Sequence, residues 1–168
     1  MSQSAQELIA RAGERGLAAA ALACLDRCLP LLGPAPDDLL RPLWCSVAEG
    51  GAGWTGRLEE VRAAVAADAG GDAAAPVRAM LAAAPAAWDA AALRVWAGSC
   101  SGAALELHRR LGGGPLLDAE ERRQVQVLEL LADAPADGRP VGLRPVLDAA
   151  AEGRRVLRAV VSRRERGA

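Results

Sequence analysis

Residues 17–29 read LAAAALACLDRCL and carry the clearest structural signal in the chain. Apolar side chains and two thiols recur there every three or four positions, as on one face of an amphipathic helix. The positions in this series are Leu17, Ala21, Cys24, Leu25, Cys28 and Leu29, followed by Leu32. We therefore predict a helix over residues 17–29 that packs against the rest of the protein by this face.

The composition of the whole chain also favours helices. Ala, Leu, Arg and Glu are abundant, whereas strand formers are scarce, with one Ile, one Thr and twelve Val. Lys, Asn, Phe and Tyr are absent, which we interpret as the codon bias of a G+C-rich genome. A length of 168 residues suits one domain and is too short for two with full cores. We predict an all-α fold in one domain spanning residues 1–168, a compact multi-helix bundle of roughly eight short helices.

A HEAT-like α-solenoid is the alternative architecture. Loop signals near Gly33, Gly70 and Gly112 lie about 40 residues apart, which is the length of a two-helix repeat. Because no residue-by-residue repeat accompanies this spacing, we favour the bundle.

Capping and loop residues predict where the helices begin and end. Ser4 is placed to cap a first helix, and Gly16 to end it. Periodicity and breaks together predict helices over residues 5–14, 17–29, 38–49, 58–68, 72–84, 85–111, 118–132 and 144–166.

Two of these helices depend on specific local signals. Pro85 opens the helix over 85–111, and we expect Gly98 and Gly102 to interrupt it. Asp118 and Glu121 have the spacing of a capping box, which predicts that the next helix begins at Asp118.

Charge and hydropathy argue against several classes of protein. The net charge of −1, from 20 Arg and 21 acidic residues, lacks the positive excess typical of a nucleic-acid binder. Residues 1–7 lack the basic and apolar regions of a signal peptide. The apolar stretch over 17–32 contains Asp26 and Arg27 and is too short to span a bilayer. We expect a cytoplasmic protein with neither a nucleic-acid nor a membrane partner.

Two glycine-rich motifs invite a catalytic or cofactor-binding interpretation. Residues 51–56 match G-x-G-x-x-G, but the segment before them favours helix and no apolar run follows, so we interpret them as an interhelical loop. Residues 98–102, GSCSG, place Cys100 where a nucleophile elbow has its nucleophile, and about 20 residues around them resemble α/β-hydrolases and thioesterases. The chain's one histidine, His108, would lie about 12 Å further along the same helix, too far to activate Cys100. We therefore favour a helix kink or a close helix crossing.

The remaining titratable residues have structural interpretations. Cys24 and Cys28 share a helix face, and a zinc site would need further ligands from Cys45, Cys100 or His108. Because Cys24 and Cys28 both lie on the apolar stripe of their helix, we favour core packing for them. His108 is interpreted as a hydrogen-bonded residue at the edge of the core. The acidic pairs at 37–38, 59–60 and 120–121 fall at expected helix starts, and we interpret them as caps. We predict no catalytic residue, no cofactor and no metal.

The C-terminal helix carries the strongest charge pattern. From Glu152 to the end the chain has six Arg and two Glu, arranged around a Val and Leu stripe. Such a helix packs by its stripe and exposes its arginines to water, but it also suits an acidic partner because arginine binds carboxylates with two hydrogen bonds. The candidate partner-binding residues are Arg154, Arg155, Arg158, Arg163 and Arg164.

The sequence thus leaves three hypotheses for function. The first is a non-catalytic helical protein that binds a protein partner or self-associates, as an adaptor or a toxin-neutralising protein. The second is a helical domain that binds a small apolar ligand, with Trp44, Trp88 and Trp96 lining the site. The third is a cysteine-based enzyme or metal protein.

Overall fold

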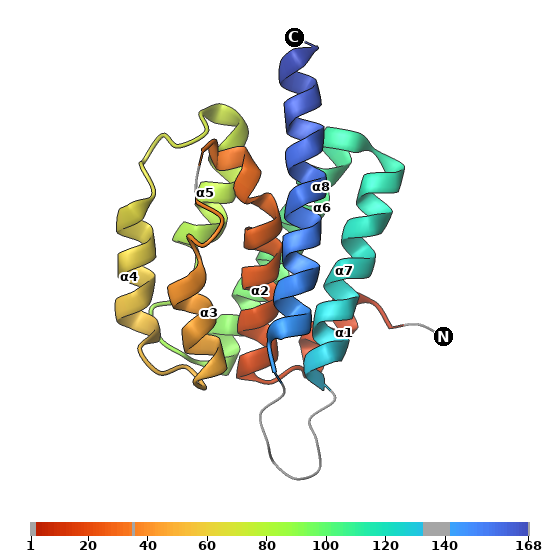
Figure 1. Cartoon of the computed structure of the whole chain (residues 1–168). Coiled ribbons are helices and arrows are strands. Elements are labelled where there is room, and N and C mark those ends of the chain that lie inside the picture. The colour runs from red at the N-terminus through yellow and green to blue at the C-terminus, as the bar shows by residue number, and fades with distance from the viewer. Residues whose placement is uncertain (1–2, 35, 133–141, 168) are drawn as a thin grey trace.

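The computed structural model describes residues 3–34, 36–132 and 142–167. Within these ranges the chain forms eight α-helices, two short 3-10 helices and no strand, which confirms the predicted all-α bundle (Figure 1). The α-helices are α1 (Ala5–Arg11), α2 (Glu14–Cys28), α3 (Arg41–Ala48), α4 (Trp54–Ala64), α5 (Ala75–Ala82), α6 (Ala90–Gly112), α7 (Gly114–Ala132) and α8 (Arg144–Arg166). The 3-10 helices are η1 (Leu29–Leu32) and η2 (Asp72–Ala74).

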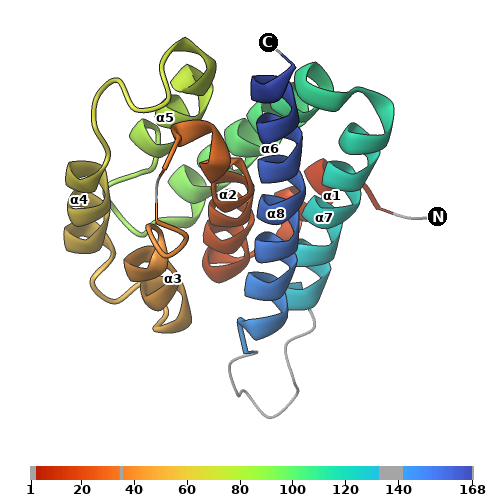
Figure 2. The ribbon, with the colours of Figure 1, turned by 45° about the horizontal axis from the view of Figure 1, so that its top comes forward.

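Helix α2 is the central element of the bundle. It packs against α3, α5, α6, α7 and α8, so elements far apart in the sequence meet on it (Figure 2). A solenoid repeat contacts only its neighbours along the chain. The solenoid alternative is therefore not needed to describe the fold.

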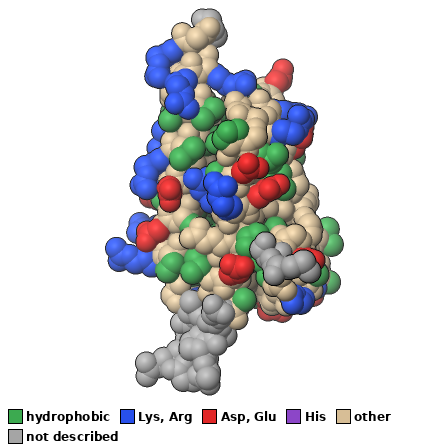
Figure 3. All heavy atoms as spheres, turned by 90° about the vertical axis from the view of Figure 1, so that its right-hand side faces the viewer, with side chains coloured by type: hydrophobic (Ala, Val, Ile, Leu, Met, Phe, Trp, Pro, Cys, Tyr) green, Lys and Arg blue, Asp and Glu red, His purple; other side chains and the backbone are tan. Residues whose placement is uncertain are grey.

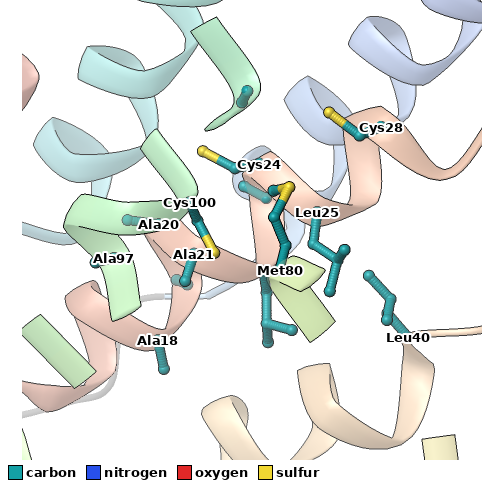
Figure 4. Close-up of a cluster of buried hydrophobic side chains, with 14 of the residues drawn as sticks. Ala18, Ala20, Ala21, Cys24, Leu25, Cys28, Leu40, Met80, Ala97 and Cys100 are labelled. Atoms are coloured by element: carbon teal, nitrogen blue, oxygen red, sulfur yellow. The ribbon is translucent and has the colours of Figure 1, made fainter. Parts of the chain in front are cut away.

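The whole circumference of α2 is buried, which differs from the single buried face that we predicted. Every residue from Leu17 to Cys28 is buried, including Asp26 and Arg27. The many alanines let neighbouring helices approach closely, while larger side chains such as Leu25 and Met80 fill the space between them (Figure 4). Two charged residues consequently lie inside the protein and need internal partners.

Local chemistry explains several helix ends. Ser4 caps α1 with a complete capping box, because Glu7 donates its backbone N–H to Ser4 Oγ and Ser4 donates its own to Glu7 Oε2. Asp89 caps α6 by accepting a hydrogen bond from the backbone of Ala92. A proline stands in the first turn of α3, α5 and α8, where no internal hydrogen bond is lost.

Several predicted boundaries are wrong, and the helix expected over 58–68 is α4, at Trp54–Ala64. The first break falls before Glu14, so Gly16 lies inside α2. Helix α6 begins at Ala90 and continues through Gly98 and Gly102, because packing of its buried face outweighs the roughly 1 kcal/mol that each glycine costs a helix. Gly113, with a positive φ of 69°, makes the turn, and α7 begins at once at Gly114. Asp118 therefore lies within α7 and does not cap it.

Among the described residues, no helix is both long and apolar enough to cross a membrane.

Candidate functional site

A buried ion pair joins α2 to α7. Arg27 donates from Nε to Glu120 Oε2 at 2.7 Å and from Nη2 to Glu120 Oε1 at 2.6 Å. Both side chains are 0% exposed. Two parallel charge-assisted hydrogen bonds of this kind are the strongest arrangement available to an arginine and a carboxylate.

Polar side chains from α6 and α7 complete this network. Gln124 donates from Nε2 to Glu120 Oε1 at 3.1 Å and to the backbone oxygen of Ser101 at 3.2 Å. The hydroxyl of Ser101 in turn donates to Gln124 Oε1. The carboxylate of Glu120 therefore accepts hydrogen bonds from Arg27 of α2 and Gln124 of α7, and Ser101 of α6 holds Gln124 in place, as a buried charge requires.

His108 borders the same carboxylate. Its Nδ1 lies 2.7 Å from the backbone oxygen of Ala104, so Nδ1 carries the proton and donates it there. Its Nε2 lies 3.4 Å from Glu120 Oε2. Burial lowers the pKa of His108 below its ordinary value, although the nearby Glu120 opposes this effect. This histidine is a hydrogen-bonded interior residue, in keeping with our interpretation of it.

The groups of this network stay in one ionisation state near neutral pH and hold three helices together. Burial opposes ionisation of Glu120, but Arg27 and its hydrogen bonds outweigh burial and hold the pKa of that carboxyl below its usual range. Burial raises the pKa of the adjacent Cys24 thiol to about 12, so this sulfur is protonated and a poor nucleophile near neutral pH. These groups join α2, α6 and α7, and Glu120 belongs to them instead of capping a helix, which corrects our interpretation of the pair at 120–121.

A second chain of ion pairs ties α8 to the bundle. Asp26 of α2 accepts a hydrogen bond from Trp44 Nε1 at 3.0 Å and pairs with Arg154 of α8. Asp37 pairs with Arg158 and lies 3.8 Å from Arg154 Nε. Arg154 and Arg158 were predicted to face a partner, but the structure shows both in contacts within the chain.

The other arginines of α8 lie toward its C-terminal end. Arg155, Arg163 and Arg166 are exposed, and no carboxylate of the described residues forms a salt bridge with them. Arg164 is also exposed and donates from Nη2 to the backbone oxygen of Arg110 at 3.0 Å. Figure 3 shows arginine side chains gathered toward this end of α8, with hydrophobic side chains at the surface beside them.

A groove of about 540 Å³ lies beside these arginines, between α8 and the α6–α7 turn. Val156 and Val160 form its α8 wall, and Val156 is 36% exposed. The remaining lining residues are Leu111, Gly112, Pro115, Leu116, Ala119, Arg163 and Arg164. The structure thus brings two predicted arginines and part of the Val and Leu stripe of α8 together with apolar residues of α6 and α7.

The three predicted ligand-binding tryptophans do not converge. Trp44 bonds to Asp26, whereas Trp88 and Trp96 both pack edge-on against Trp54, with ring centroids 5.4 Å and 5.8 Å away. The indole N–H groups of this cluster have partners within the protein, namely Pro85 for Trp54, Glu14 for Trp88 and Met80 for Trp96. The cluster joins α4 and α6, and a role in ligand binding stays a prediction.

Three of the four cysteines lie inside the core. Cys24, Cys28 and Cys100 are buried, whereas Cys45 is exposed. The GSCSG segment lies within α6, where burial raises the pKa of Cys100. The G-x-G-x-x-G segment runs from a loop into α4 and follows helix α3 rather than a strand. In the part of the chain that the structure describes, no three His, Cys, Asp or Glu side chains are placed to hold a metal ion.

Sequence reasoning interpreted Glu120 as a helix cap and assigned no role to Gln124 or Trp54. Two charges within the apolar run over 17–32 were a signal that Arg27 has a buried partner. Nothing local identified that partner, because Glu120 lies 93 residues further along the chain.

Comparisons of this chain with known protein families, with curated proteins and with solved structures gave no match. Family membership therefore assigns no role to any residue described above. The charges, burial and contacts of the residues themselves carry the proposal that follows.

Proposed function

We propose that this chain is a non-catalytic helical protein that binds an acidic protein partner through the C-terminal end of α8. The observation that carries the proposal is the contrast among the arginines of this helix. Arg154 and Arg158 have carboxylate partners within the chain, whereas Arg155, Arg163 and Arg166 have none among the described residues. Exposed guanidinium groups of this kind are available to carboxylates of another protein.

The distribution of charge over the chain supports the same partner. The segment from Glu152 onward has a charge of +4, and the net charge of the chain is −1, so the remaining residues have an excess of acidic groups. An acidic partner is attracted to the end of α8 and repelled elsewhere. Such segregation orients a partner during encounter and speeds association at low salt.

The state of the polar interior argues against catalysis. The candidate nucleophiles Cys24 and Cys100 are buried and have raised pKa values. The one histidine is fixed by Ala104 and is 1% exposed. A general base and a nucleophile both need access to a substrate, and these groups have no such access.

Charge reversal at α8 tests the proposal. The tagged protein would be used to retain proteins from an extract of the cells that produce it, beside the variant R155E/R163E/R166E. The matched control is R11E/R41E/R144E, which changes the net charge equally at three exposed arginines outside the C-terminal part of α8.

We expect a protein that is retained by the wild type and the control, is lost with the α8 variant, and is released as salt concentration rises. Equal retention by all three, or no protein retained by the wild type, would overturn the proposal.

A further inference from the structure

The groove beside α8 exists because α8 extends past the elements that cover its other turns. Its buried residues follow one line along the helix, through Ala150, Gly153 and Leu157. The same three-to-four spacing continues to Val160 and Val161, which are only partly buried, and then to Arg164, which is exposed. In Figure 1 this end of α8 projects beyond the other helices. The core-facing side of α8 is thus left without a complete neighbour over its last turns.

The walls of the groove come from α8, from α7 and from the end of α6. Val156 and Val160, one turn apart on α8, face Leu111 at the end of α6 and Leu116 and Ala119 of α7. Its volume of about 540 Å³ is within the range of sites that hold a ligand or a few large side chains. Arg163 and Arg164 also line the groove, so two cations border an otherwise apolar surface.

We infer that this groove binds an amphipathic helix of the acidic partner, with aliphatic side chains between α7 and α8 and a carboxylate on Arg163 or Arg164. This inference rests on the proposed function and adds the form of the partner segment and the place where it docks. A helix suits the site because helices form its walls, and a further helix packs its i, i+3 and i+4 side chains between α7 and α8.

The arginines explain why the segment is acidic. Arg164 already donates a hydrogen bond to the backbone oxygen of Arg110, so its guanidinium group loses less conformational freedom when it binds a partner. A carboxylate at the edge of an apolar contact forms two hydrogen bonds with such a group. The apolar residues supply contact area, and the arginines select for negative charge.

A second copy of this chain is a poorer occupant than another protein. In a two-fold dimer formed through the groove, the same patch lies on both subunits. Arg163 and Arg164 would then face their own copies, and like charges in an interface oppose association.

The chain offers a closely matched pair of variants for the test. Val156 lines the groove and is 36% exposed, whereas Leu147 is 38% exposed on the same helix and does not line it. Val156→Glu and Leu147→Glu therefore add one negative charge at equally exposed positions of α8. Circular dichroism would show that both variants keep the helical fold.

The probe is a synthetic 18-residue helix of Leu and Glu with one apolar face, labelled with a fluorophore, beside a scrambled peptide of the same composition. Fluorescence anisotropy would measure binding to the wild type and to both variants. We expect the amphipathic peptide to bind the wild type and the Leu147→Glu variant alike, and to bind the Val156→Glu variant about tenfold or more weakly. We expect the scrambled peptide to bind all three weakly.

Equal affinity for Val156→Glu and wild type, equal affinity of the two peptides, or no binding of either would overturn the inference. Failure here is distinguishable from failure of the proposed function. A partner that is retained from the extract by Val156→Glu but lost with R155E/R163E/R166E would leave acidic-partner binding at α8 intact and exclude the groove.

Discussion

Gly153 of α8 lies directly against the side chain of Arg27 of α2. A Cβ atom at position 153 would lie 2.8 Å from Arg27 Cγ and closer still to Cδ, and it would also lie 3.2 Å from Arg123 Cδ. Arg27 has little freedom to move aside, because Glu120 holds its guanidinium group by two hydrogen bonds. The glycine therefore lets α8 cover the buried ion pair, although glycine is unfavourable within a helix.

Gly153→Ala is expected to destabilise the protein by about 1–3 kcal/mol, because the added methyl group must displace a fixed side chain. Gly102→Ala is the control, since Gly102 also lies within a helix but a Cβ there would have no neighbour within 4 Å. That substitution should stabilise the protein by up to about 1 kcal/mol. Urea denaturation monitored by circular dichroism measures both. Similar changes for the two glycines would contradict the close approach of α8 to Arg27.

Removing one partner of the buried ion pair is expected to be costly. Arg27→Met leaves the carboxylate of Glu120 buried without its cation, and Glu120→Gln leaves Arg27 without its anion. Each should lower the free energy of unfolding by about 3–5 kcal/mol. The double variant should lose much less than the sum of the two, since neither charge is left unpaired. Additive losses in urea denaturation would show that the two residues do not interact.

Stability is expected to fall as the pH is lowered from about 6.5 into the acid range. Burial lowers the pKa of His108 below its ordinary value of 6.5, so the unfolded chain binds this proton first. The stability that depends on neutral His108 is complete above pH 6.5 and is lost as the pH falls through the lower pKa of the folded state. His108→Gln should give a flatter profile over the same window. Thermal melts at fixed ionic strength across this range measure the effect, and parallel profiles would refute it.

At lower pH, two buried carboxyls also titrate, and their protonation changes the stability of the fold in opposite directions. The pKa of Glu120 is below its ordinary value of 4.5, so its contribution is lost as the pH falls further. Burial raises the pKa of Asp26 above 3.8, although Arg154 opposes this, so protonation of Asp26 favours the folded state. Asn resembles the protonated carboxyl at every pH, so Asp26→Asn should be tolerated better near neutral pH than in acid, as urea denaturation of both proteins at the two pH values would measure.

One thiol is expected to react rapidly in the native protein. Cys45 is exposed, whereas Cys24, Cys28 and Cys100 are buried and have raised pKa values, so they are neither accessible nor ionised. A disulfide exchange reagent should modify about one thiol per chain before unfolding and the other three afterwards. Cys45→Ser should abolish the rapid phase. Rapid modification of Cys24 or Cys28 in the folded protein would revive the hypothesis of a cysteine-based enzyme.

Local sequence signals predicted the class of fold and several element ends. The helix over 144–166 has the bounds that we predicted, and Ser4 forms the capping box of α1. Both depend on residues within a few positions of each other, because helix propensity, capping and proline at a first turn act over one or two turns. The apolar run over 17–29 was correctly predicted to form a helix, but it did not reveal that the helix is buried on every side.

The tertiary structure decided the partners of the charged residues. Asp118–Glu121 has the pattern of a helix start, yet α7 begins at Gly114, and Glu120, within this helix, pairs with Arg27 of α2. Arg154 and Arg163 look alike on a helical stripe, but Asp26 and Asp37 lie within reach of the first only. Helix formation was readable from the sequence because its interactions are local. Which arginines are held inside and which remain for a partner depends on residues brought together from distant parts of the chain.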